Sequence, residues 1–175
     1  MEQWMLVRPT EAQLEAVRAY RQAFLDAGDS MDGCGPLRRY EDPADWLAEV
    51  RRYEDPATVP ADKVEADQFL CLREADGAVL GMIQVRRRLN EYLALCGGHI
   101  GYSVRPDERR KGVAKWMLHE VLAHCRALGL TRVMVSCLVD NEASRRTILA
   151  NGGVYERTAL NPLSDHMLEV YWITV

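Results

Sequence analysis

Apolar residues recur with helical spacing most clearly over residues 112–128, and Gly129 follows as a helix terminator. The apolar positions of this segment share one face: Ala114, Met117, Leu118, Val121, Leu122, Cys125 and Leu128. This spacing predicts an amphipathic helix packed on a core. The continuous apolar run at 131–139 predicts a buried strand directly after it, and residues 141–151 predict a shorter helix.

A second helical stripe follows a strand-like run at residues 2–8 and ends at Gly28. Thr10 and Gln13 stand at its start, three residues apart, as in a capping box. Residues 29–35 predict a loop, and an amphipathic piece surrounds Trp46. The sequence RRYEDPA occurs at 38–44 and again at 51–57. We interpret the two copies as similar helix or turn boundaries, since one short duplication is too little for a repeat architecture.

The remaining apolar runs predict strands. They lie at 68–73 and 78–88, which a turn signal at 75–77 joins as a hairpin, and at 97–104, 154–158 and 167–175. Strands and helices in this order predict an α/β protein built on one mixed sheet. No linker-like segment divides the chain, so we expect a single domain over residues 1–175.

Composition limits the classes of partner and the compartment that we expect for this chain. The chain has 175 residues, is 48% hydrophobic and 27% charged, and carries a formal net charge of −4, which argues against a general nucleic-acid binder. Its five cysteines are scattered, which favours a reducing compartment over a disulfide framework or a zinc site. The start lacks a signal-peptide pattern, and no run approaches the roughly 20 apolar residues of a membrane span. We therefore expect a cytoplasmic protein without a metal, a membrane partner or a nucleic-acid partner.

The start of the 112–128 helix carries an unusual charge. Residues 105–115 contain five Arg or Lys and two acids, a sum of +5 − 2 = +3, where the helix dipole already favours anions. A bound pyrophosphate would relieve this repulsion, and Gly112 would let it approach the backbone closely. A solvated basic turn is the alternative. Neither GxxxxGK[ST] nor a strand-to-helix GxGxxG is present.

Residues 109–114, RRKGVA, match the [QR]-x-x-G-x-[GA] signature, and here the sequence resembles the GNAT superfamily of N-acetyltransferases. A strand ending in Val-Arg-Pro precedes the signature, while Asn141, Ser144 and an Asn-Gly-Gly turn follow the next strand. The resemblance is best over residues 68–158. It implies a central, mostly antiparallel sheet of about six to seven strands flanked by helices.

The resemblance also implies a site for acetyl-coenzyme A. Backbone amides of the signature, Arg109, Arg110, Lys111, Gly112, Val113 and Ala114, would hold the pyrophosphate, with Lys115 one turn into the helix. Tyr102, Ser103 and Val104 would pair with the pantetheine arm. The Val104 amide would stabilise the negative charge that develops on the thioester oxygen. Asn141 and Ser144 would contact the coenzyme from the next helix.

The implied activity is transfer of an acetyl group from acetyl-CoA to an amine by direct attack. Ile148 departs from the family pattern, because a tyrosine that protonates the departing thiolate often stands there. A module that binds acyl-CoA as a ligand or sensor without efficient turnover is therefore the alternative. His99 is a candidate base, since an unperturbed pKa near 6.5 suits an ammonium proton. A histidine paired at a strand edge is the other interpretation.

Two charged segments remain. Arg86, Arg87 and Arg88 could reach the 3′-phosphate of the coenzyme or form a solvated strand end. Residues 41–67 hold nine acids against three bases, a sum of 3 − 9 = −6, and could form an acidic wall that attracts a cationic acceptor. A solvated acidic surface is the alternative. We expect a small-molecule or peptide amine as acceptor and a monomer or homodimer.

Overall fold

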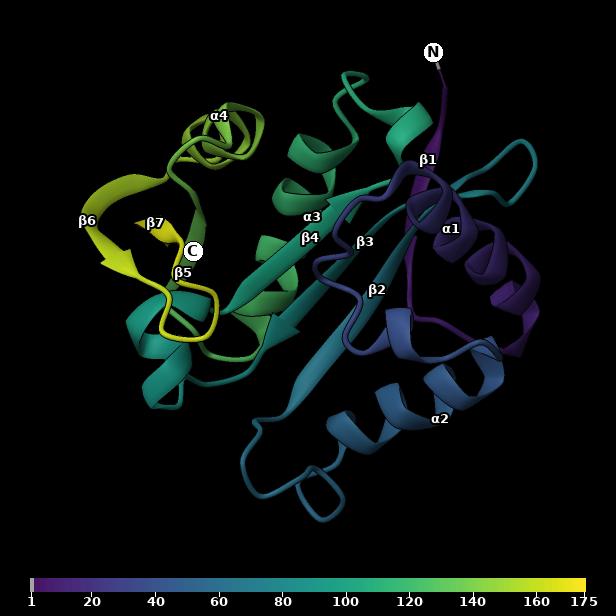
Figure 1. Ribbon diagram of the computed structural model, residues 1–175, viewed down its shortest axis with the longest axis horizontal. Helices are drawn as coiled ribbons and strands as arrows, with labels where there is room; N and C mark the ends of the chain where they lie inside the picture. Colours follow the sequence, from purple (N-terminus) through teal and green to yellow (C-terminus); the bar gives the residue numbers. More distant parts are fainter. Residues whose placement is uncertain (1) are drawn as a thin grey trace.

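The computed structural model describes residues 2–175 as one mixed sheet with helices on both faces (Figure 1). The strands are β1 (Trp4–Val7), β2 (Ala66–Arg73), β3 (Val79–Arg86), β4 (Ile100–Val104), β5 (Arg132–Leu138), β6 (Val154–Leu160) and β7 (Met167–Thr174). The helices are α1 (Leu14–Ala27), α2 (Pro43–Glu54), α3 (Val113–Ala127) and α4 (Glu142–Ala150). Short 3-10 turns form η1 (Glu11–Gln13), η2 (Leu37–Arg39) and η4 (Pro106–Glu108), and a π-helical turn forms η3 (Leu93–Gly97).

The sheet has seven strands in the order β1-β2-β3-β4-β5-β7-β6. All neighbouring pairs are antiparallel except β4 and β5, which run parallel and share one register pair, Ile100 with Val135. The predicted fold class is confirmed, including the mostly antiparallel sheet. The strand predicted over 97–104 is shorter than expected, because Gly97 ends η3 and Gly98 has a positive φ of 70°.

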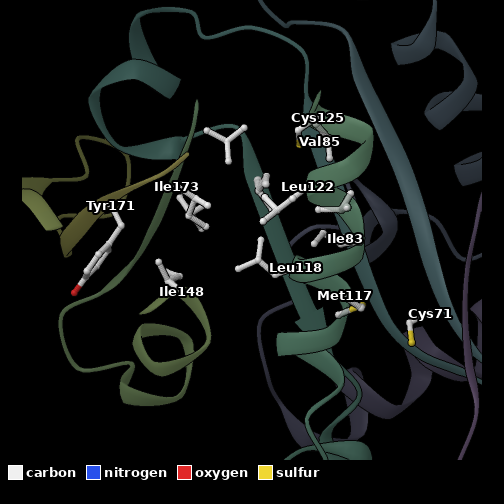
Figure 2. Close-up of a cluster of buried hydrophobic side chains, with 14 of the residues drawn as sticks. Cys71, Ile83, Val85, Met117, Leu118, Leu122, Cys125, Ile148, Tyr171 and Ile173 are labelled. Carbon is white, nitrogen blue, oxygen red and sulfur yellow. The ribbon is translucent and has the colours of Figure 1, made fainter. Parts of the chain in front are cut away.

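Two large apolar clusters cover opposite faces of the sheet. One buries α3 and Ile148 of α4 against β3, β5 and β7, and Figure 2 shows Met117, Leu118 and Leu122 within it. The other buries α1 and α2 against Leu70, Leu72 and Met82. Side chains alternate between faces along a strand, so β4 directs Tyr102 and Val104 toward the α3 face and Gly101 and Ser103 toward the α1 face.

Local sequence signals set the helix boundaries. The Thr10–Gln13 capping box forms, with the Thr10 N–H donating to the Gln13 side chain at 2.9 Å. The two RRYEDPA copies mark the two ends of α2: the Asp42 carboxylate accepts from the Ala44 N–H at the start, and the Asp55 carboxylate accepts from the Ala57 N–H after the end. The interpretation of the duplication as two similar boundaries is confirmed.

Two further observations concern membrane spans and metal sites. No helix within residues 2–175 has the length and apolar character to cross a membrane. Over the same residues, no group of three or more His, Cys, Asp or Glu side chains is placed to hold a metal ion.

Candidate active site

The sheet is open between β4 and β5. The Arg86 N–H donates to the His99 carbonyl and the Arg105 N–H donates to the Leu80 carbonyl, so residues 101, 103 and 105 direct their backbone groups toward β3. The His99 N–H instead donates to the Met134 carbonyl of β5 at 2.8 Å. By the same alternation, the N–H groups of Tyr102 and Val104 point toward β5, which pairs with β4 only at Ile100. An extended ligand can therefore pair with β4 in this gap.

Helix α3 begins where the gap ends. Its first helical hydrogen bond runs from the Trp116 N–H to the Gly112 carbonyl, which leaves the amides of Val113, Ala114 and Lys115 without helical acceptors. The N-cap residue, Gly112, has no side chain that could cap this end. Arg110 and Gly112 have positive φ angles of 64° and 92°, so the loop turns sharply just before the free amides. These amides, together with the dipole of α3, make an anion site.

The charges around this site are partly paired within the protein. Arg109 binds Asp29 at 2.7 Å, Lys111 binds the buried Glu108 at 2.5 Å, and Arg105 binds Asp107 at 2.7 Å. Within residues 2–175, Arg110 and Lys115 have no carboxylate partner. Of the predicted basic side chains, these two are therefore available to an anion, whereas Arg109 and Lys111 shape the loop and contribute backbone.

A pocket of about 230 Å³ lies beside the start of α3. The sequence predicts two of its lining residues, Gly112 and Lys115, as part of a site, but not the others. The lining is Gly112, Lys115, Trp116, His119, Ala150 and Asn151. Trp116 stands one turn after Gly112 and is only partly buried, and this position of a large aromatic residue is the signal that could have predicted the pocket. Lys115, Trp116 and Asn151 place a cation, an indole and a side-chain amide beside the free backbone amides of α3. This combination suits a ligand that has both phosphate and aromatic groups.

Helix α4 forms the other wall of the gap. The Asn141 side chain caps α4 by accepting the Ser144 N–H at 3.1 Å. The Ser144 hydroxyl lies 2.7 Å from the Tyr102 hydroxyl and joins α4 to β4. Burial raises the pKa of Tyr102 well above its usual value. Ile148 is fully buried in the apolar cluster (Figure 2) and has no group that could exchange a proton.

His99 lies at the closed end of the gap. It is 6% exposed, and its Nδ1 accepts the Met134 N–H at 2.9 Å. Burial, and then the nearby Arg86 charge, lower the pKa of His99 to about 4. While the bond to Met134 stands, the neutral ring carries its proton on Nε2 and has no free lone pair. The predicted base role stays a prediction, and it requires that the Met134 N–H be released first.

His99 gives a prediction for stability. Folding favours the neutral ring, so its contribution is complete above the unfolded pKa near 6.5 and is lost as pH falls toward about 4. By pH 5 the loss is about 2 kcal/mol. In His99→Asn an amide oxygen can accept the Met134 N–H without titrating, so urea unfolding at pH 7.5 and pH 5 should show a smaller difference than in wild type. His166→Asn, at an exposed position, is the control. Equal pH sensitivity in wild type and His99→Asn would contradict this account.

The opposite face of β4 is covered by the 29–35 loop. A side chain at Gly33 would meet the Gly101 carbonyl at 2.2 Å, so loop and strand touch through their backbones. The buried Gln68 donates to the Gly33 carbonyl at 2.8 Å, and Tyr20 lies 2.9 Å from the Ser103 hydroxyl. The predicted contact residue Ser103 therefore turns its side chain away from the coenzyme gap and toward the loop.

The acids at 41–67 do not form a free acidic wall. Six of the nine have cationic partners within the protein: Asp42, Glu49, Glu54, Asp62, Glu65 and Asp67. Asp67 is fully buried among Arg8, Arg87 and His124, so it does not face solvent. Helix α2 packs on β2, two strands away from β4. These positions give little support to steering of an acceptor by this segment.

The gap between β4 and β5 lies beside the start of α3, where the amides are free and Arg110 and Lys115 lack acid partners among the described residues. This arrangement is that of an acyl-coenzyme A transferase fold. The sequence model described as the acetyltransferase (GNAT) family matches residues 35–152, so the chain belongs to that family. The enzyme class, an acyltransferase, and the cosubstrate acetyl-CoA predicted from the signature are confirmed. No curated protein matches the sequence.

Several solved structures have the same fold. The ribosomal-protein-S5-alanine acetyltransferase of Vibrio fischeri superposes with a TM-score of 0.74 at 16% identity, covering 99% of this chain and 94% of the other. Mycobacterium smegmatis RimJ in complex with CoA-disulfide gives 0.74 at 18% identity, covering 98% and 82%. The protein yncA of Salmonella typhimurium, solved with its cofactor acetyl-CoA, gives a TM-score of 0.67 at 14% identity, covering 98% of this chain and 93% of the other.

Proposed function

We propose that this protein transfers the acetyl group of acetyl-CoA directly to an amine. The observation that supports this most is the continuity of the open β4 edge with the free amides of α3. Acetyl-CoA supplies an activated thioester to this site. The amides of Val113 and Ala114, with Arg110 and Lys115, would bind its phosphates. The gap-facing N–H groups of Tyr102 and Val104 would hold its extended arm, and Val104 would donate to the oxygen that becomes negative during attack.

The test is release of free thiol from acetyl-CoA with a panel of amines. Two similar structures are described as acetyltransferases of ribosomal-protein alanine and serine, so the panel includes peptides that begin with Ala or Ser. Trp116, one of four tryptophans, lines the pocket, so binding is followed by the change in total tryptophan fluorescence. Binding without turnover of any amine would favour the sensor alternative, which the aliphatic Ile148 supports. Failure to bind acetyl-CoA would overturn both.

His99→Asn also tests the catalytic base. If His99 accepts the ammonium proton, the variant should slow transfer by about 10²–10⁴-fold throughout pH 5.5–9, because a ring with a pKa of about 4 is neutral over that whole range. The measurement is the initial rate across that range at saturating acetyl-CoA. A variant with the wild-type rate and profile would leave His99 only its bond to Met134.

We place the reaction in the cytoplasm, where reduced cysteines persist. All five cysteines are free and buried, as a reducing compartment allows. A monomer or homodimer is proposed as the functional state, and light scattering at working concentration decides between them.

A further inference from the structure

Arg86 is the last residue of β3, and two more arginines follow it directly. Within residues 2–175, Arg87 and Arg88 have carboxylate partners and Arg86 has none. Arg87 binds Asp67 at 2.7 Å and Arg88 binds Glu65 at 2.9 Å. Arg86 has no carboxylate within ion-pair distance among residues 2–175. Its Nη1 donates to the carbonyls of Gly97 and Gly98 at 3.1 and 3.3 Å, and its Nε and Nη2 have no partner over the same residues.

The guanidinium of Arg86 is partly buried, and burial lowers its pKa. Buried cations are normally paired, because desolvation of an isolated charge is costly. Neither Nε nor Nη2 is among the fully buried, unbonded polar atoms of the described residues, so each keeps some solvent-exposed surface. The fork geometry of these two donors suits a carboxylate or phosphate.

The Arg86 side chain lies against β4, on the face of the sheet opposite α3. Its Nη2 is 3.4 Å from the position that a side chain at Gly101 would take, so the guanidinium occupies the space beside Gly101 and next to Tyr102. The charge of Asp32, an exposed acid in the loop over β4, also acts on it. The Ser103 hydroxyl donates to the Asp32 carbonyl, which keeps that loop on the strand.

The coenzyme phosphates are not the anion that fits Arg86. In the β3–β4 register Gly81 pairs with Val104, and Arg86 lies five residues further along β3. At about 3.3 Å per residue this is about 16 Å from the level of Val104, the end of β4 that leads into the signature loop. Arg86 also belongs to the face that α3 does not cover. An anion that reaches it must come with the acceptor.

We propose that Arg86 binds an anionic group of the acceptor, a carboxylate or a phosphate, so that the substrate is a small amine that also carries a negative charge. Asp32, on the same face, attracts the ammonium end. This rests on the proposed acetyl transfer and names the substrate class of that site. A free amino acid and a phosphorylated amine share this chemistry, and the experiment separates them.

The experiment compares matched acceptors at saturating acetyl-CoA: glycine with glycinamide, and O-phosphoethanolamine with ethanolamine. The charged member of at least one pair should have a kcat/KM at least 10-fold higher, mainly through KM. Arg86→Met should abolish that preference, and Arg86→Lys should retain part of it. Arg88→Met, two residues after Arg86 and just beyond the end of β3, is the matched control and should keep the wild-type preference.

Binding of a product analogue gives a readout apart from turnover. The N-acetylated product of the favoured acceptor, N-acetylglycine or N-acetyl-phosphoethanolamine, titrated calorimetrically, should bind wild type and lose at least 10-fold in affinity in Arg86→Met, while acetyl-CoA still changes the tryptophan fluorescence. If acetyl-CoA neither binds nor reacts, the proposed function itself fails. If acetyl-CoA reacts, but wild type and Arg86→Lys prefer neutral amines or peptides to the same extent, only the role of Arg86 is overturned. This outcome does not depend on whether Arg86→Met folds.

Discussion

Gly112→Glu is expected to remove measurable binding of acetyl-CoA. Nothing lies within 4 Å of the position that a side chain at Gly112 would take, so the carboxylate would extend into the open space beside the free amides of α3. A unit negative charge about 4–5 Å from a phosphate costs about 3–4 kcal/mol at an effective dielectric near 20. This corresponds to a loss of affinity of at least about 100-fold. The measurements are tryptophan fluorescence and the shift of Tm with acetyl-CoA.

Gly129→Glu is the matched control for this change. Gly129 has a positive φ of 83°, like the 92° of Gly112, and also has open space around it, but it follows the other end of α3. Both substitutions strain the backbone at a left-handed position by a similar amount. Gly129→Glu should therefore lower Tm similarly while acetyl-CoA binds as in wild type. Equal coenzyme affinity in the two variants would show that the phosphate site is elsewhere.

Asp67→Asn is expected to cost about 2–4 kcal/mol of unfolding free energy, the largest stability effect we predict. The Asp67 side chain is fully buried and binds Arg8, Arg87 and His124 at 2.7–2.8 Å. Replacing it with a neutral amide of the same shape leaves two guanidinium groups facing each other without a counter-charge. Part of the cost is relieved because those groups are 40% and 31% exposed. Urea unfolding at pH 7 measures the effect.

The same ion cluster predicts the acid limb of stability. Bonds from Arg87, His124 and Arg8 outweigh desolvation and hold the pKa of Asp67 well below its usual range. Its contribution is therefore present above about pH 4 and is lost as pH falls below that value. Asp62→Asn, in an exposed pair with Lys63, is the control and should change the unfolding free energy by less than about 0.5 kcal/mol. A cost for Asp67→Asn no larger than for Asp62→Asn would contradict a structural role for the cluster.

Much of the fold follows from local patterns. The capping box at Thr10, the end of α1 at Gly28 and the apolar face of α3 are short-range signals, and each is found where the sequence predicts it. Strand order is not local: β7 enters between β5 and β6, which depends on how distant segments pair. The start of β4 was also predicted too early, since Gly97 and Gly98 belong to a π-helical turn and its end.

The features of the candidate site also divide into those that the local sequence predicts and those that depend on distant segments. The signature loop and its glycine could be recognised because a motif at a helix start has a fixed geometry. The partners of charged side chains could not, since they come from remote segments. Thus Arg109 pairs with Asp29 and His124 pairs with Asp67, while Arg86 alone of its triplet has no acid partner among residues 2–175. Sequence shows the charges, and only the tertiary structure shows which remain uncompensated.

The single pairing between β4 and β5 has a consequence for cooperativity. One register pair joins the β1–β4 half of the sheet to the β5–β7 half, whereas β5 and β7 share seven. We expect the two halves to exchange their amide hydrogens with different opening free energies, as separate foldons. A ligand arm bonded to β4 within the gap would act as an added strand and join these foldons. The ligand-dependent slowing of exchange should therefore extend beyond the contact residues into β5 and β7.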